Sequence, residues 1–278
     1  MKKSLASFEK LLIIKGYSPN TVSAYLNALK LVQRVVKFTD WSTLEDVYLQ
    51  DLCLALFTRK QMSYNYQKQV IGAVQLFFSL LYDRKVPLSI LSVTRKSFKL
   101  PVVLSKAEIG NLLRVTHNLK HKAILSTIYA MGLRVGEMIN LQIAHLDGER
   151  NVVTIYNAKG KKDRQVMFPK SLKLLLRSYY KMYKPDTYLF NGKGNLQYSS
   201  SSALKVLIRS AKNAGITKRV TLHTVRHSFA THLLEQGTDV RVIQKLLGHN
   251  SIKTTMIYTH VASDQIVKVK SPIDSIEL

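Results

Sequence analysis

The segment LHTVRHSFATHLLEQGTDVRVIQKLLGHNSIKTTMIYTHV, residues 222–261, combines a helical pattern with an unusual set of polar and aromatic side chains. Its first part predicts two helices, and His223 and Arg226 share a face of the first because they lie three positions apart. Further on, His249 precedes Tyr258 by nine residues. Spacing alone does not single out Tyr258, because the chain contains 14 tyrosines. The role of this segment therefore depends on the groups that other parts of the chain supply.

Two segments upstream carry such groups. In GLRVGEMINL, residues 132–141, Arg134 and Glu137 lie one helical turn apart. In AKGKKDRQV, residues 158–166, Lys159 stands beside a glycine in a basic turn. The runs NVVTIYNA and RQVMFP on either side of that turn are short and rich in β-forming residues, which predicts an antiparallel hairpin.

Helical patterns surround this hairpin and fill the N-terminal third of the chain. Ser18 followed by Pro19 marks a helix start, and Ser105 with Glu108 forms a capping pattern for another helix. A stretch with two prolines and several Lys and Arg residues separates the two parts without clear periodicity. The predicted fold is mainly α with a small antiparallel β-sheet (α+β), arranged as an N-terminal helical domain at 1–85, a basic linker at 86–102 and a second domain at 103–278.

The charge balance points to a polyanionic partner. Lys and Arg total 42 against 17 acidic residues, a formal net charge of +25, and the excess is present in both halves of the chain. Binding to nucleic acid fits this excess, because each neutralised phosphate releases condensed counterions. A single cysteine, Cys53, excludes an intramolecular disulfide and favours a reducing cytoplasm, and no apolar run reaches the roughly 20 residues of a membrane span.

Together these groups fit phosphoryl transfer without a metal. Arginines grip phosphate oxygens and neutralise charge that grows in the transition state. A tyrosine hydroxyl is a nucleophile for phosphorus if a histidine takes its proton and cations surround it. A lysine on a hairpin is suited to protonating the oxygen that leaves.

Each feature also has a structural interpretation. Arg134 and Glu137 taken alone fit an exposed helical ion pair. His223 and His227 have the spacing of a zinc helix, but Thr224 stands where a zinc protease carries glutamate, so no metal is expected. For His227 and a later histidine, His232, helix packing or hydrogen bonding is a better interpretation than catalysis. The serines at 199–202 most simply cap a helix.

In this order, GLRVGE, AKGKKDR and the long segment 222–261 resemble the tyrosine recombinase (phage integrase) family. The last segment is close to the form found in Xer-type and integron-type members. YSPNTVSAYLNALKLV, residues 17–32, is similar to the SAM-like core-binding domain of that family. The resemblance implies an N-terminal core-binding domain and a C-terminal catalytic domain that form a C-shaped clamp on DNA.

The resemblance also implies roles for the phosphate-binding groups. Arg134 and Arg226 match the two arginines that clamp the scissile phosphate. His249 fills the position of the histidine or tryptophan that contacts a non-bridging oxygen. Glu137 matches an acidic position that supports this geometry without reacting.

Three further roles concern bond making and breaking. Tyr258 resembles the nucleophile that forms a 3′-phosphotyrosyl bond, and His223 the histidine that assists its proton transfer. Lys159 resembles the general acid for the departing 5′ oxygen, although Lys161 and Lys162 in the same turn are alternatives.

Candidates for binding DNA lie on three predicted helices and in the basic turn, which contributes Lys161 and Lys162. Lys205, Arg209 and Lys212 recur on one helix of the second domain, and Asn20 and Gln67 belong to the N-terminal helices. Solvated helix faces are an equally good interpretation of any one of them.

The resemblance implies a site-specific recombinase that needs no cofactor or metal and acts as a homo-tetramer on double-stranded DNA through a Holliday junction. It would be cytoplasmic and nucleoid-associated, serving DNA integration, excision, inversion or chromosome-dimer resolution. The alternatives are a type IB topoisomerase and a catalytically silent DNA-binding protein. The tail after Tyr258 keeps apolar residues that, in the family, dock on a neighbouring protomer: Val261, Ile266, Val267, Ile273 and Ile276.

Overall fold

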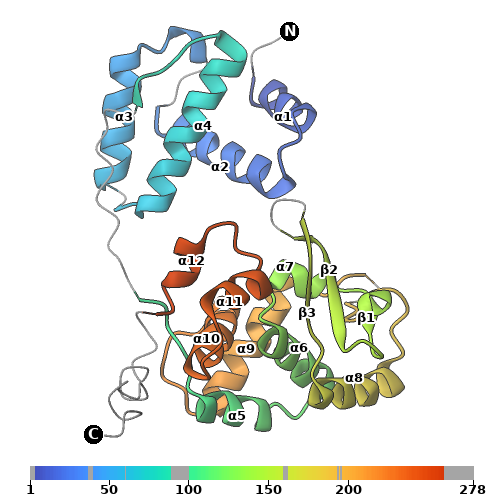
Figure 1. Cartoon of the computed structure of the whole chain (residues 1–278). Helices are drawn as coiled ribbons and strands as arrows, with labels where there is room; N and C mark the ends of the chain where they lie inside the picture. Colours follow the sequence, from blue (N-terminus) through green and yellow to red (C-terminus); the bar gives the residue numbers. More distant parts are fainter. Residues whose placement is uncertain are drawn as a thin grey trace, which may run out of the picture. The chain divides into compact units, whose positions relative to one another are not determined.

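The computed structural model describes residues 4–36, 40–59, 61–88, 100–158, 162–192, 194 and 196–259. The chain divides into two compact units, Met1–Phe98 and Lys99–Leu278, which we call the first and second unit (Figure 1). Each unit buries a hydrophobic core of its own. None of the described helices has the length and apolar character needed to cross a membrane.

The first unit is a bundle of helices around aromatic side chains. The ring centroid of Phe77 lies 4.7 Å from that of Trp41 and 5.3 Å from that of Phe8. The Ser18 hydroxyl accepts a hydrogen bond from the backbone N–H of Thr21, which starts the second helix as the sequence predicts. The described elements are α1 (Leu5–Ile14), α2 (Pro19–Val36), the 3-10 turn η1 (Trp41–Thr43), α3 (Asp46–Arg59) and α4 (Tyr64–Tyr82).

The first unit extends further along the chain than the sequence predicts. Val86 and Leu88, assigned to a linker at 86–102, are 3% and 0% exposed and belong to the core of this unit. The Gln50 amide also donates a hydrogen bond to the Pro87 carbonyl, at 3.2 Å. Burial of these two apolar side chains stabilises the first unit relative to a state in which water hydrates them. The linker prediction was therefore wrong for residues 86–88, and residues 89–99 lie outside the described part.

The second unit is mainly helical with one small sheet, which confirms the predicted fold class. Strands β1, β2 and β3 lie side by side in that order and are antiparallel, with Val153 of β2 opposite Val166 of β3. The capping pattern is also confirmed, because Glu108 N–H donates to Ser105 and Ser105 N–H donates to Glu108. The described elements are α5 (Lys106–Arg114), α6 (Leu119–Met131), α7 (Val135–Ile139), η3 (Ile143–His145), β1 (Leu146–Asp147), β2 (Val152–Ala158), β3 (Lys162–Met167), α8 (Lys170–Tyr183), α9 (Ser200–Asn213), α10 (Leu222–Glu235), α11 (Val240–Leu247) and α12 (Ile252–Met256).

Helix α10 lies at the centre of the second unit, packed against α6, α9 and α11 (Figure 1). Its close approach to α6 depends on Gly132, which ends α6 with φ 59°. A Cβ on Gly132 would lie 2.4 Å from Cδ1 of Phe229, so only glycine allows this packing. Gly248 ends α11 in the same left-handed conformation, with φ 61°. Gly132 thus brings the end of α6 against α10, while a Cβ on Gly248 would lie 3.0 Å from Cδ of Arg164 in β3.

Candidate active site

A buried carboxylate, that of Glu137, organises the polar centre of the second unit. Its Oε1 accepts hydrogen bonds from Arg134 Nη1 and Arg164 Nη1, each at 2.7 Å. Its Oε2 accepts from Arg164 Nη2 at 2.8 Å and from the backbone N–H of Arg134 at 2.8 Å. A third guanidinium, Arg226 Nη1, lies 3.6 Å from Oε2. The Glu137 side chain is only 8% exposed, so its contact with Arg134 is not a solvated surface pair.

The charges of this cluster persist at neutral pH. Burial alone would raise the pKa of Glu137, but the hydrogen bonds and charge of Arg164, with help from Arg134, lower it to about 2. Burial, followed by the charge of Arg134, lowers the pKa of Arg226 to about 10, which still leaves it protonated. Three guanidinium groups against one carboxylate leave the cluster cationic, as a phosphate-binding site requires.

The same three arginines hold the end of α11. Arg164 Nε donates to the carbonyl of Leu246 at 2.7 Å, and Arg226 Nη2 donates to Leu247 at 2.6 Å. Arg134 Nη2 donates to the carbonyl of Gly248 at 3.0 Å. The last carbonyls of a helix lack partners within it and carry partial negative charge. Three consecutive carbonyls are therefore satisfied by three arginines, which fixes the start of the segment that leads to Tyr258.

His249 follows this fixed helix end directly. Its Nδ1 lies 2.9 Å from the hydroxyl of Thr255, and its carbonyl accepts from the amide of Gln244 at 3.0 Å. Burial, together with the charges of Arg226 and Arg134, lowers the pKa of His249 to about 4. The ring is therefore neutral near pH 7, with its Nδ1 side occupied by Thr255.

Tyr258 lies inside the unit. Its side chain is 1% exposed and packs with Phe229 and Leu247 in a small apolar cluster. Its hydroxyl lies 3.0 Å from Nδ1 of His227, and its ring is nearly parallel to that of His249, with centroids 6.4 Å apart. Burial raises the pKa of Tyr258, although Arg226 and Arg134 act in the opposite direction. The hydroxyl is thus protonated and lies within the field of the arginine cluster.

His223 stands at the exposed edge of the same region, one helical turn before His227. The two rings lie 6.3 Å apart. Partial desolvation, followed by the charges of Arg226 and Arg134, lowers the pKa of His223. Lys159 and Lys161 lie outside the described residues, and of Lys162 the structure describes only the backbone, at the start of β3. The described residues thus bring together Arg134, Glu137, His223, Arg226, His249 and Tyr258.

Two residues of this site, Arg164 and His227, were not among the catalytic candidates from the sequence. Arg164 lies in the AKGKKDR segment, but only the lysines of that segment were candidates for a catalytic role. His227 was expected to pack or to form a hydrogen bond; the bond is confirmed, but its partner Tyr258 was not foreseen. His232 likewise bonds through Nδ1 to the Tyr129 hydroxyl, at 2.9 Å.

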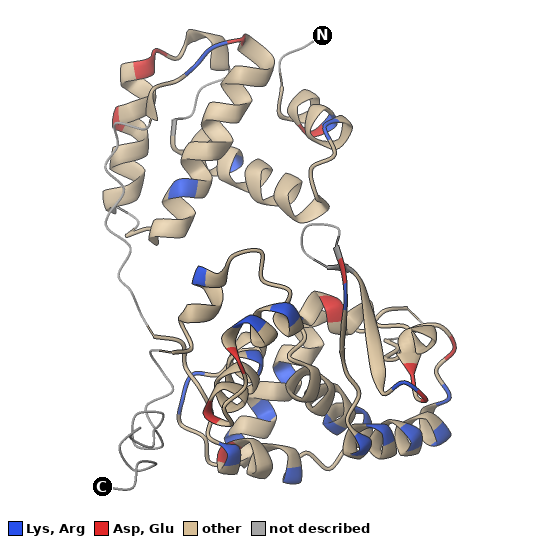
Figure 2. Cartoon of the chain, viewed as in Figure 1, with Lys and Arg blue, Asp and Glu red and all other residues tan. Residues whose placement is uncertain are grey.

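The residues proposed to bind DNA differ in how exposed their side chains are. Lys205, Arg209 and Lys212 are all exposed on α9, which Ser199 caps by accepting from Ser202 N–H at 3.0 Å. Figure 2 shows Lys and Arg along α8, α9 and α11, and these three helices contain no Asp or Glu.

In the first unit, Asn20 is exposed in the first turn of α2. The assignment of Gln67 to DNA reading was wrong. Its side chain is 5% exposed and its amide donates to the Met62 carbonyl at 2.8 Å, so it closes the turn before α4. Within the described ranges, no group of three or more His, Cys, Asp or Glu residues could hold a metal ion.

Comparison with known proteins identifies the family of this chain. Residues 102–265 match the phage integrase family. The chain is 36% identical to the integrase/recombinase homologue y4qK of Sinorhizobium fredii, over 94% of this chain and 85% of the other. It is 31% identical to the tyrosine recombinase XerD of Oceanobacillus iheyensis, over 93% of each chain. The crystal structure of the XerH site-specific recombinase in a post-cleavage complex with its difH substrate superposes with a TM-score of 0.75 at 22% identity, covering 98% of this chain and 85% of the other. The chain therefore belongs to the phage integrase family.

Proposed function

We propose that the protein cleaves and rejoins DNA at specific sites, with Tyr258 as the nucleophile. The observation that carries this proposal is the position of the Tyr258 hydroxyl, bonded to one histidine and within the field of Arg134 and Arg226. Family membership supports it, as does the net charge of +25. XerC and XerD recombinases, named as tyrosine recombinases, are among the relatives that align over more than nine tenths of the chain.

The arginines retain donors for a phosphate. A guanidinium has five N–H donors, and the contacts with Glu137, with the Gly132 carbonyl and with the carbonyls at the end of α11 use only some of those on Arg134 and Arg226. The remaining N–H groups are suited to the non-bridging oxygens of a phosphodiester, whose negative charge grows as Tyr258 attacks. Because the cluster is fixed before DNA binds, this stabilisation needs little rearrangement during the reaction.

Attack by Tyr258 conserves the energy of the phosphodiester bond. The Tyr258 oxygen forms a bond to phosphorus while the bond from phosphorus to the 5′ oxygen breaks. A 5′ hydroxyl from a second strand can reverse this step and seal the exchange without nucleotide hydrolysis. The departing 5′ oxygen takes a proton from an acid, for which Lys159 is our candidate.

We further propose that DNA binding uses the exposed cations of α9, Lys205, Arg209 and Lys212, together with Asn20 on α2. Phosphate contacts position a protein on DNA, and a few side chains at base edges supply specificity. We also propose that the protein acts as a tetramer during strand exchange.

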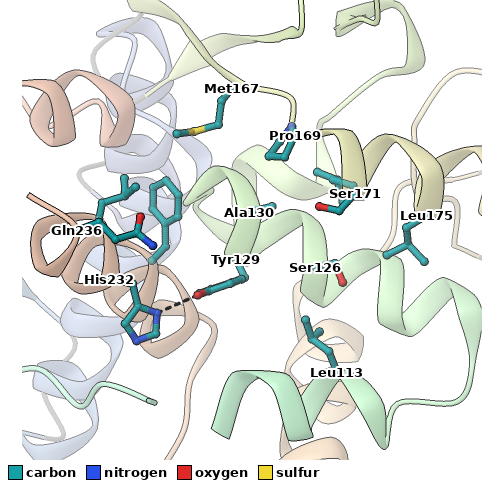
Figure 3. A pocket seen from close by; sticks show the side chains of 13 residues that line it. Leu113, Ser126, Tyr129, Ala130, Met167, Pro169, Ser171, Leu175, His232 and Gln236 are labelled. Carbon is teal, nitrogen blue, oxygen red and sulfur yellow. Dashed lines mark hydrogen bonds between the residues drawn. The ribbon is translucent and has the colours of Figure 1, made fainter. Parts of the chain in front are cut away.

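A pocket in the second unit is suited to contacts between copies in such an assembly. It has a volume of about 480 Å³ and lies where α5, α6, α8 and α10 meet (Figure 3). Its lining is largely apolar and includes Leu113, Ala130, Leu175 and Leu233. We propose that it accepts the apolar tail of a neighbouring copy; that tail, residues 261–278, lies outside the described residues.

Filling the pocket should impair assembly while leaving the chemistry intact. Ser126 lines the pocket on α6, so Ser126→Trp is expected to reduce junction formation between two DNA sites about tenfold or more. Cleavage of a single bound site should continue. Ser178→Trp, on the exposed face of α8 outside the pocket, is the matched control. If removal of residues 262–278 and Ser126→Trp have additive effects, the tail does not use this pocket.

The proposed function is tested with a nicked suicide substrate carrying the cognate site. The wild-type protein should form an SDS-resistant covalent adduct with DNA, and with two intact sites it should form Holliday junctions. Relaxation of supercoiled DNA without strand exchange would indicate a type IB topoisomerase instead. DNA binding without any adduct would indicate a catalytically silent protein.

A further inference from the structure

We propose that Arg164 is a positioning residue, which balances the charge of Glu137 and aligns Arg134 and His249 on one phosphate of the substrate DNA. This inference rests on the proposed function and extends it to a side chain that does not itself contact DNA. Arg164 acts through two protein partners, the carboxylate of Glu137 and the backbone at the end of α11.

The sheet holds the backbone of Arg164. Its partner across the β2–β3 pair is Ile155, whose side chain is 2% exposed and belongs to the main core of the second unit. Successive side chains of a strand point to opposite faces, and the neighbours of Arg164, Asp163 and Gln165, are both exposed. The Arg164 side chain is only 8% exposed. The strand therefore directs this guanidinium into the unit from a fixed point, toward α7 and the end of α11.

Arg164 is the main counter-ion of Glu137. Its Nη1 and Nη2 donate to the two carboxylate oxygens at 2.7 and 2.8 Å, the forked geometry in which a guanidinium binds a carboxylate most strongly. Arg134 contributes one side-chain bond to the same carboxylate, from Nη1 at 2.7 Å. Burial raises the pKa of Glu137, and Arg164 contributes more than Arg134 to lowering it to about 2. Because Arg164 balances this charge, the positive charge of Arg134 stays available to a phosphate.

Arg164 also fixes the backbone that leads into His249. Its Nε donates to the carbonyl of Leu246 at 2.7 Å. Its side chain packs against Gly248, where a Cβ would lie 3.0 Å from Cδ of Arg164 and 3.3 Å from its Nε and Nη1. The carbonyl of the same glycine accepts a hydrogen bond from Arg134 Nη2 at 3.0 Å. Both arginines thus contact the residue that precedes His249, and a shift of Arg164 would move the histidine relative to Arg134.

The alignment of these groups affects the reaction more than it affects DNA binding. Negative charge grows on the non-bridging oxygens of the phosphate during attack, and donors stabilise it only from fixed positions. A displacement of about 1 Å can cost on the order of 100-fold in rate. Affinity for DNA is the sum of many phosphate contacts, so a small shift of one pair of groups changes it little. Loss of Arg164 should therefore lower the cleavage rate without lowering the affinity.

The experiment compares Arg164→Gln and Arg164→Lys with the wild-type protein in single-turnover cleavage of two suicide substrates. One carries the normal scissile phosphodiester, and in the other, a methylphosphonate, a methyl group replaces one non-bridging oxygen and removes the negative charge. Arg164→Gln should cleave the phosphodiester about 100-fold more slowly. Arg164→Lys should lose less, because lysine keeps the charge without the fork. On the methylphosphonate both variants should cleave within about fivefold of the wild type, because less charge has to be stabilised.

A purely structural role of Arg164 gives a different result. If the variants lose the same factor on both substrates, Arg164 supports folding or the placement of Tyr258, and the proposal is wrong. A loss of DNA affinity in a band-shift assay that matches the loss of rate would make Arg164 a DNA ligand and also overturn it. So would cleavage of the phosphodiester by Arg164→Gln at the wild-type rate. An absence of adduct with wild-type protein on both substrates would instead count against the proposed function itself.

Two further variants separate alignment from loss of charge and from loss of stability. Arg177→Gln removes one positive charge from the exposed face of α8 and should match the wild type on both substrates. Gly248→Ala keeps the charge of Arg164 but places a Cβ against its side chain, at a backbone φ of 61°, and should reproduce the selective loss on the phosphodiester. Thermal unfolding shows whether each protein is folded at the assay temperature. If Arg164→Gln is not, Arg164→Lys and Gly248→Ala decide the question by the same ratio of rates on the two substrates.

Discussion

Tyr258→Phe is expected to abolish the covalent adduct with a suicide substrate while leaving specific DNA binding intact. The decrease in cleavage rate should be on the order of 10⁴-fold or more, as for loss of other covalent nucleophiles. Phenylalanine fits the same apolar cluster beside Phe229 and Leu247, so folding should change little. Loss of the hydroxyl removes one hydrogen bond to His227, worth about 1 kcal/mol. Denaturing gel electrophoresis of the adduct and a band-shift assay of binding measure the two effects.

The matched control is Tyr179→Phe on α8. Tyr179 is also 1% exposed and lies in the main core of the second unit, so the substitution removes an equally buried hydroxyl. Adduct formation should match the wild type in this variant. An adduct that persists in Tyr258→Phe at more than a trace level would assign the nucleophile to another residue and remove the basis of the proposed mechanism.

Features with a local physical cause were predicted well from the sequence. The helix starts at Ser18 and Ser105 depend on side chains that bond to N–H groups three residues away, and both are confirmed. The hairpin of β2 and β3 was predicted from two short runs of β-forming residues on either side of a basic turn. The predicted linker was wrong at Val86 and Leu88, because their burial depends on the core of the first unit and not on neighbouring residues in the sequence.

The candidate active site shows the same difference between local features, which the sequence reveals, and long-range contacts, which it does not. The segments that resemble the family singled out Arg134, Glu137, Arg226 and Tyr258, and the structure places these side chains close together. The role of Arg164 was missed, since its partners are Glu137, 27 positions away, and the Leu246 carbonyl, 82 positions away. Gln67 was misassigned because a glutamine on a helix gives no sign of which backbone carbonyl it will meet.

Glu137→Gln is expected to disable the site and to destabilise the second unit. The change leaves Arg134, Arg164 and Arg226 together without their shared counter-charge and places an amide N–H₂ against their donors. Removing one partner of a buried ion pair costs about 3–5 kcal/mol. Cleavage should decrease on the order of 10³-fold, since two phosphate-binding arginines lose their alignment. Chemical denaturation and single-turnover cleavage below the unfolding transition measure these effects.

A pH series isolates the contribution of the carboxylate charge. The pKa of Glu137 is lowered from 4.5 to about 2 in the folded protein, so its charged form favours folding. This contribution, about 3 kcal/mol, is complete above pH 4.5 and is lost as the pH falls toward 2. Wild-type stability should therefore fall more steeply in this window than that of Glu137→Gln. Glu108→Gln, which alters a pair with Lys218 at the surface of the same unit, should cost less than about 1 kcal/mol and leave cleavage unchanged. Equal pH slopes for Glu137→Gln and the wild type would mean that the arginines are held by their carbonyl contacts at the end of α11 and not by Glu137.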